Sequence, residues 1–176
     1  FAGIASISAS LPTDDNLDCQ KSGAAIPVMV INGTADPINP FEGGMVRLGY
    51  TALGNVLSTK GTGEYFAKLN GITSAPTTAK LPHKNAGDPT SVEVTNWGPA
   101  GKPLVVVYTV HGGGHIVPQP VFPFPDGLGR QTQDLDAPAA PHFMPLISDN
   151  WTKHFKWRGT GPLPEEESQK LKLLVA

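Results

Sequence analysis

The sequence predicts an α/β fold with a mostly parallel sheet and flanking helices. The chain has 176 residues, of which 39% are hydrophobic, enough for one packed core. Near-continuous apolar runs at Ile26–Ile31 and Leu104–Val110 are typical of strands buried on both faces of a parallel sheet. Ile4–Ser10 is a third, shorter strand candidate. Enough chain for a crossover separates these runs, so we expect consecutive parallel strands of one sheet.

The segments between these strands supply a helix and a further strand. Ser58 can cap a helix that ends at Asn70-Gly71, and its apolar residues recur at helical spacing: Tyr65, Phe66 and Leu69. Gly61 and Gly63 weaken the first turn of that helix. The alternating segment Ser91–Trp97 is separated from Leu104–Val110 by a Gly- and Pro-rich turn, which predicts a strand pair.

The last third of the chain is rich in proline. Seven prolines fall within residues 118–145, too many for a helix or a central strand, which predicts an ordered surface loop or lid. Ser148 can cap a closing helix with Trp151 and Phe155 at helical spacing, and the tail around Glu165 is expected to be solvated. We expect residues 1–176 to form one globular unit.

The composition argues against several classes of partner. Lys and Arg total 13 against 15 Asp and Glu, so the chain carries no field that would attract nucleic acid. No apolar run reaches the length of a membrane-spanning helix, so we expect no membrane partner. The spacing of His, Cys and carboxylate residues suggests no metal site, and we expect no cofactor.

Candidate catalytic groups follow the two strongest strands. Asn32-Gly-Thr-Ala-Asp-Pro37 comes directly after Ile26–Ile31, and His111-Gly-Gly-Gly-His115 comes directly after Leu104–Val110. Functional groups of open α/β sheets gather beyond the carboxyl ends of the strands. Asp36 and His115 are therefore the candidate acid and base of a catalytic triad, and we expect a hydrogen bond between them.

Three segments, in order, resemble the polyhydroxybutyrate depolymerase and feruloyl-esterase-like family of α/β-hydrolases. They are Pro27–Pro40, Gly112–His115 and Leu128–Asp136, and the resemblance runs from about Phe1 to Phe155. By residue-to-residue match, the triad acid of the family falls on Asp36 and its base on His115. The chain departs from the family after His115, where Ile116-Val117-Pro118 replaces Thr-Trp-Pro.

The resemblance implies a secreted or periplasmic serine esterase, with residues 1–176 as the C-terminal portion of its single α/β-hydrolase catalytic domain. Its substrate would be a polyester or a hydroxycinnamoyl-type carboxylic ester, which could be polymeric, and Phe122 and Phe124 offer an apolar wall that suits either. In α/β-hydrolases the catalytic serine comes first along the chain, followed by the acid and then by the histidine. His115 would act as general base and then acid, while Asp36 would orient it.

The nucleophile and the oxyanion donors are expected upstream of this sequence. The chain opens at Phe1 inside a probable strand, contains no Gly-x-Ser-x-Gly motif, and its Ser6, Ser8 and Ser10 lack flanking glycines. An N-terminal segment of the same protein would then be a partner, carrying the serine and any disulfide partner of Cys19; a buried free thiol is the alternative for Cys19. Two other hypotheses are a non-catalytic hydrolase-like binding protein and the processed C-terminal chain of a two-chain hydrolase.

Other residues carry weaker interpretations. His111 is a rival base because it lies nearer the strand end. The remaining histidines are expected in solvent, in the lid and on a helix surface, respectively: His83, His142 and His154. Gly43-Gly44 predicts a close-packed loop beside the acid, since no following Lys-Ser/Thr supports phosphate binding.

Overall fold

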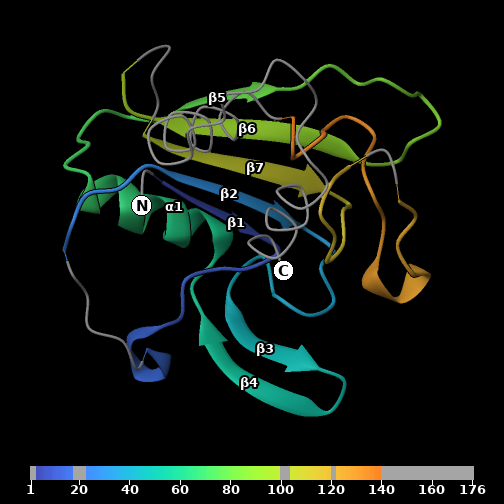
Figure 1. Ribbon diagram of the computed structural model, residues 1–176, viewed down its shortest axis with the longest axis horizontal. Helices are drawn as coiled ribbons and strands as arrows, with labels where there is room; N and C mark the ends of the chain where they lie inside the picture. Colours follow the sequence, from blue (N-terminus) through green and yellow to red (C-terminus); the bar gives the residue numbers. More distant parts are fainter. Residues whose placement is uncertain (1–2, 18–22, 100–103, 120–121, 140–176) are drawn as a thin grey trace, which may run out of the picture.

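The computed structural model describes residues 3–17, 23–99, 104–119 and 122–139, and a mixed five-stranded sheet lies at its centre (Figure 1). Its strands lie in the order β1-β2-β7-β6-β5, and a two-stranded hairpin, β3-β4, stands apart. The strands span Ile4–Ile7 (β1), Val28–Gly33 (β2), Gly44–Leu48 (β3), Thr51–Val56 (β4), Thr77–Lys80 (β5), Ser91–Trp97 (β6) and Val105–His111 (β7).

The parallel half of the sheet confirms the expected strand order. β1 pairs with β2, and β2 with β7, both in parallel, with Val28 opposite Ile4 on one side and Val105 on the other. All six residues of β2 are buried, as its continuous apolar sequence predicts. β1 is shorter and less buried than expected, because it ends at Ile7 and Ile4 is 41% exposed. It forms the edge of the described sheet.

The other half of the sheet is antiparallel. β6 pairs with β7 from Ser91 opposite His111 to Trp97 opposite Val105, which confirms the predicted strand pair. β5 adds an outer strand that the sequence did not predict. Its four residues are all exposed and include no large apolar side chain, so no hydrophobic pattern marks it.

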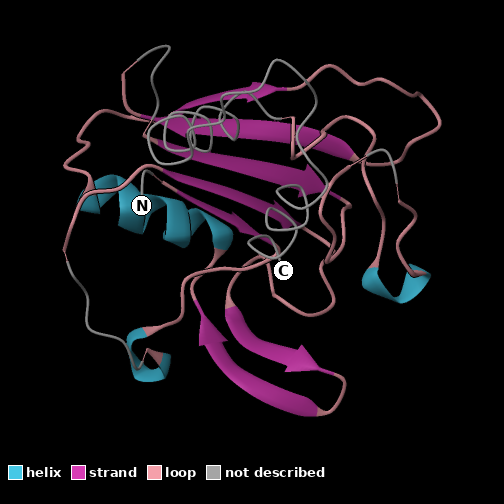
Figure 2. Ribbon diagram, in the orientation of Figure 1, coloured by secondary structure: helices cyan, strands magenta, loops and turns pink. Residues whose placement is uncertain are grey.

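Helix α1, Thr59–Leu69, covers one face of the sheet (Figure 2). The Ser58 hydroxyl accepts a hydrogen bond from the Gly61 amide, and the helix ends at Asn70 with Gly71 at φ 69°, so both predicted boundaries are confirmed. Gly63 allows the helix to approach the sheet closely, because a Cβ there would lie 2.8 Å from a Val107 methyl carbon. This is the only α-helix among the described residues.

Two apolar clusters lie on opposite faces of the sheet, as strand alternation requires. The cluster beneath α1 includes Val30, Ala67, Trp97 and Val107. On the other face, the described part of the proline-rich segment packs against the sheet through buried Leu135 and Ala137. That part, residues 118–119 and 122–139, contains one 3-10 turn, η2 (Asp126–Leu128), and no strand or α-helix, in keeping with the predicted ordered loop.

The β3-β4 hairpin was not predicted from the sequence. β3 is exposed at four of its five positions, so it lacks the one-sided burial that alternation reveals. The hairpin attaches to the short 3-10 helix η1 (Asp14–Asn16) through neighbouring backbone, with Thr13 donating to the Asn55 carbonyl at 3.1 Å. The close packing expected at Gly43-Gly44 is present at Gly43, where a Cβ would lie 2.6 Å from the Ser58 nitrogen, but not at Gly44, which faces open space.

Several sequence predictions fall outside the described residues. They concern Cys19, His142, His154, the closing helix after Ser148 and the tail around Glu165. Within the described ranges, none of the helices is long and apolar enough to cross a membrane.

Candidate active site

Asp36 lies in the loop that follows β2, and its carboxylate is fully buried. The Oδ1 atom accepts hydrogen bonds from the backbone amides of Ile38 and Asn39, each at 2.8 Å. These two bonds fold the loop back over the carboxylate as an Asx turn does. They leave the Oδ2 atom to bind a group from another loop.

His115 lies in the glycine loop that follows β7. Gly112 takes a left-handed backbone conformation with φ 71°. The Gly114 amide donates to the Arg130 carbonyl at 2.9 Å, and a Cβ at Gly114 would lie only 2.0 Å from the Leu128 oxygen. The His115 amide donates to that same Leu128 carbonyl at 2.7 Å. Gly112 thus provides the positive φ, and Gly114 allows the close backbone approach, that the sequence predicts for this loop.

The two candidate residues are hydrogen-bonded, as predicted. His115 Nδ1 lies 2.9 Å from Asp36 Oδ2 and 3.2 Å from Oδ1. An ionised carboxylate can only accept, so Nδ1 carries the proton and donates to Asp36. The imidazole is 31% exposed, which leaves Nε2 free to act as a base toward a group outside this pair.

Backbone bonds hold the two loops in register. The Ala35 amide donates to the Gly113 carbonyl, and the Thr34 amide donates to the Val110 carbonyl, both at 2.9 Å. The Gly112 amide donates to the Thr34 hydroxyl at 2.8 Å. Because the parallel strands β2 and β7 are direct neighbours, these loops leave the same edge of the sheet side by side.

A buried polar network supports the loop of Asp36 and escaped the sequence reasoning. The Ser10 hydroxyl accepts from the side-chain amides of Asn32, at 3.0 Å, and of Asn39, at 3.3 Å. The Asn32 amide also donates to the Thr59 hydroxyl at 2.8 Å. Asn32 and Asn39 are 1% and 3% exposed, so these bonds replace water. These hydrogen bonds join four segments of the chain to one another next to the loop of Asp36. No local spacing of residues in the sequence predicts this network.

The histidines other than His115 have different surroundings. His111, the rival base, is exposed at the end of β7, and no carboxylate of the described residues hydrogen-bonds its ring. His83 is exposed, as predicted, but it also has a partner that the sequence did not indicate, because its Nδ1 lies 2.8 Å from the buried Asp134. The hydrogen bond to Asp134 raises the pKa of His83 above its ordinary value of 6.5.

The serines near the start of the chain all make other hydrogen bonds. Ser6 donates to the Ala9 carbonyl at 3.0 Å, and Ser8 donates to the Ile116 carbonyl at 3.3 Å. Ser8 has φ 54° and is buried at the end of β1, so it links this strand to the loop of His115. Within the described ranges, no group of three or more His, Cys, Asp or Glu residues could hold a metal ion.

Comparison with known proteins gives one informative similarity. The chain is 34% identical over 142 residues to a protein of Nocardia uniformis subsp. tsuyamanensis that is described as "Putative esterase NocK". This match covers 77% of the chain but only 41% of the relative. No protein-family model matches the chain, and no solved structure matches it either.

Proposed function

We propose that this chain supplies the acid and base of a serine-type carboxylic ester hydrolase of the α/β-hydrolase class. The observation that carries the proposal is the hydrogen bond between His115 Nδ1 and the buried Asp36 carboxylate, beyond the carboxyl ends of two adjacent parallel strands. The similarity to a protein described as an esterase supports the same reaction class.

In the proposed mechanism, His115 Nε2 removes the proton of a serine hydroxyl as that oxygen attacks the ester carbonyl carbon. Asp36 holds the imidazole in the tautomer with the proton on Nδ1 and stabilises the imidazolium that forms. The imidazolium then returns its proton to the departing alcohol, and a water molecule repeats the sequence to release the acid. Each of these steps requires that Nε2 of His115 be accessible to the reacting groups, and the partial exposure of the imidazole allows this.

The nucleophilic serine belongs, in this proposal, to an N-terminal segment of the same protein. The chain spans about 41% of the length of the curated relative that it matches. A serine ahead of both acid and base agrees with the chain order of α/β-hydrolases. The ester substrate would be a polyester or a hydroxycinnamoyl ester, and an enzyme that acts on polymeric esters would be secreted or periplasmic.

The experiment measures hydrolysis of 4-nitrophenyl acetate, methyl ferulate and polyhydroxybutyrate film by the protein that contains this chain and its upstream segment. We expect His115→Ala to lower kcat by about 10³-fold or more, as for other triad residues. His111→Ala is the matched control and should retain activity. Equal losses in both variants, or full activity in His115→Ala, would contradict the proposal.

A further inference from the structure

Ser8, at the end of β1, has an unfavourable backbone conformation. It is the one non-glycine residue of the described ranges with a positive φ, 54°. In this left-handed region a Cβ crowds the backbone, so glycine, asparagine and aspartate are its usual occupants. Ser8 is also only 8% exposed, so its hydroxyl needs a partner within the protein. Residues held in such conformations gather at functional sites, so we looked for a role of Ser8 in the reaction.

The backbone of Ser8 is tied to the strand that leads to the acid. Its amide donates to the Ile31 carbonyl at 2.9 Å, one residue beyond the pairing of Ile7 with Ile31. Because β1 and β2 are parallel, Ser8 lies at the same edge of the sheet as the loops of Asp36 and His115. The strand pairing therefore holds Ser8 in its left-handed conformation next to the candidate site.

The side chain of Ser8 reaches the loop of the base. Its hydroxyl donates to the carbonyl of Ile116, the residue directly after His115, at 3.3 Å. On the other side of the imidazole, the His115 amide donates to the Leu128 carbonyl at 2.7 Å. The backbone is thus hydrogen-bonded both before and after the His115 side chain. A glycine would adopt the φ of Ser8 more easily, but it would supply no hydroxyl for this bond.

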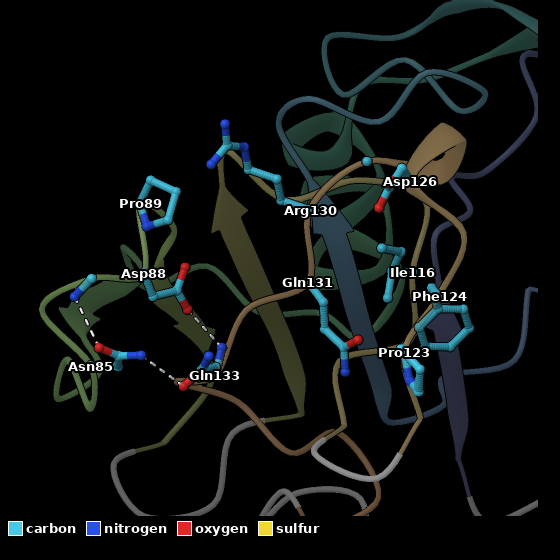
Figure 3. A pocket seen from close by; sticks show the side chains of 12 residues that line it. Asn85, Asp88, Pro89, Ile116, Pro123, Phe124, Asp126, Arg130, Gln131 and Gln133 are labelled. Carbon is cyan, nitrogen blue, oxygen red and sulfur yellow. Dashed lines mark hydrogen bonds between the residues drawn. The ribbon is translucent and has the colours of Figure 1, made fainter.

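Packing alone holds Ile116 less firmly than a residue of the core. Its side chain lines a cavity of about 680 Å³, and in Figure 3 it lies on the same side of this cavity as Phe124. A side chain that faces a cavity lacks partner atoms on that side, so it loses part of the dispersion attraction that fixes core residues. The hydrogen bond from Ser8 therefore contributes more to the placement of this residue, and of the adjoining His115, than it would in a close-packed setting.

We propose that Ser8 is a positioning residue for the reaction, and that its hydroxyl holds the backbone of Ile116 so that the imidazole of His115 faces the upstream serine. The inference rests on the proposed function, because it requires a serine that His115 deprotonates. Ser8 itself forms and breaks no bond of the substrate. Its unfavourable backbone conformation serves to aim the hydroxyl at the loop of the base.

The test compares two variants of Ser8 in the protein with its upstream segment. Ser8→Ala removes the hydroxyl and keeps the unfavourable φ, whereas Ser8→Gly removes the hydroxyl and relieves the backbone. We expect kcat for 4-nitrophenyl acetate to fall about tenfold in both variants, with KM changed by less than about twofold. The midpoint of thermal unfolding should be higher in Ser8→Gly than in Ser8→Ala. Ser6→Ala is the matched control and should retain kcat, because the Ser6 hydroxyl bonds only to the nearby Ala9 carbonyl.

The outcomes separate this inference from the proposed function. If Ser8 served stability alone, kcat would follow stability, so a kcat that recovers in Ser8→Gly would overturn the inference. Unchanged kcat in both variants, or a loss that appears in KM instead, would also overturn it. If the unaltered protein hydrolyses no ester, the proposed function fails, and the downfield NMR signal of the His115 Nδ1 proton, identified by its loss in His115→Ala, decides. A signal that shifts or disappears in both Ser8 variants but not in Ser6→Ala would support positioning, and an unchanged signal would overturn it.

Discussion

The chain contains two histidine–carboxylate pairs that are built almost alike. His115 Nδ1 lies 2.9 Å from Asp36 Oδ2, and His83 Nδ1 lies 2.8 Å from Asp134 Oδ2. Both carboxylates are fully buried, and the imidazoles are 31% and 39% exposed. Distance and burial therefore do not distinguish a catalytic pair from a structural one.

The settings of the two pairs differ. Asp36 and His115 follow neighbouring parallel strands whose carboxyl ends meet at one edge of the sheet. His83 and Asp134 instead join the connection between β5 and β6 to the loop after η2, and the Lys84 amide donates to Asp134 Oδ1 at 2.8 Å. We infer that the first pair serves the reaction and the second holds two loops together.

The largest difference is expected when each acid is replaced. Asp36→Asn should lower kcat for ester hydrolysis about 10³- to 10⁴-fold, because an amide no longer enforces the tautomer with the proton on Nδ1. Asp134→Asn should lower kcat only a fewfold. Steady-state kinetics of both variants check this, and comparable losses in kcat would show that the pairs do not divide the roles in this way.

The glycine loop of His115 gives the next largest effect. Gly114→Ala should lower kcat about 10²-fold, because the added methyl meets the Leu128 oxygen and displaces the imidazole. Gly127→Ala is the control, since a Cβ there has no neighbouring atom within 4 Å. Kinetics and circular dichroism of both variants would test this. Unchanged kcat in a folded Gly114→Ala protein would contradict the described loop.

The second pair should show its effect in stability. Asp134→Asn removes the charge from the hydrogen bonds with His83 and the Lys84 amide, so the free energy of unfolding should fall by about 1.5–3 kcal/mol. Chemical denaturation measures this. Glu93→Gln, a substitution on β6, is the control. A loss no larger than that of the control would mean that the pair does not hold the loops.

A pH dependence follows from the raised pKa of His83, which faces Asp134 and lies near Asp88 and Lys84. Because the pKa is higher in the folded state than its ordinary 6.5, this contribution to stability is complete below about pH 6.5 and is lost as pH rises through the folded value. We expect His83→Gln to flatten this part of the pH–stability curve. Identical curves for both proteins would show that His83 carries no such linkage.

The smallest expected effect concerns the network behind Asp36. Asn39→Ala removes the side-chain bond to Ser10 but keeps the backbone amide that binds Asp36 Oδ1. We expect a decrease in kcat of about tenfold or less, with KM nearly unchanged, since the acid is held less firmly. Asn39→Ser, whose hydroxyl can still donate a hydrogen bond, should restore part of it. A larger loss in KM than in kcat would assign Asn39 to substrate binding instead.

Strong patterns in the sequence predicted the parallel half of the sheet and the pairing of Asp36 with His115. Continuous apolar runs marked β2 and β7, and polar turns directly after them marked the site. β5 and β3 were harder to predict, because nearly all of their residues are exposed and they bear no one-sided apolar pattern.

Long-range polar contacts explain the remaining differences. His83 and Asp134 are 51 residues apart in the sequence, and Ser10 and Asn39 are 29 apart. Such pairs meet only when the sheet brings their loops to one edge, so neither residue has a local signal. The shortened β1 has a similar origin, because the left-handed backbone of Ser8 ends a run that looks extended through Ser10.

The central claim is that Asp36 and His115 activate a serine that lies upstream of this chain. Labelling the active protein with a biotinylated fluorophosphonate, followed by peptide sequencing, tests it most directly. We expect one labelled serine, in an upstream peptide with a Gly-x-Ser-x-Gly motif, and loss of labelling in His115→Ala. A label on Ser8 or any other residue of this chain, or labelling that persists without His115, would contradict the claim.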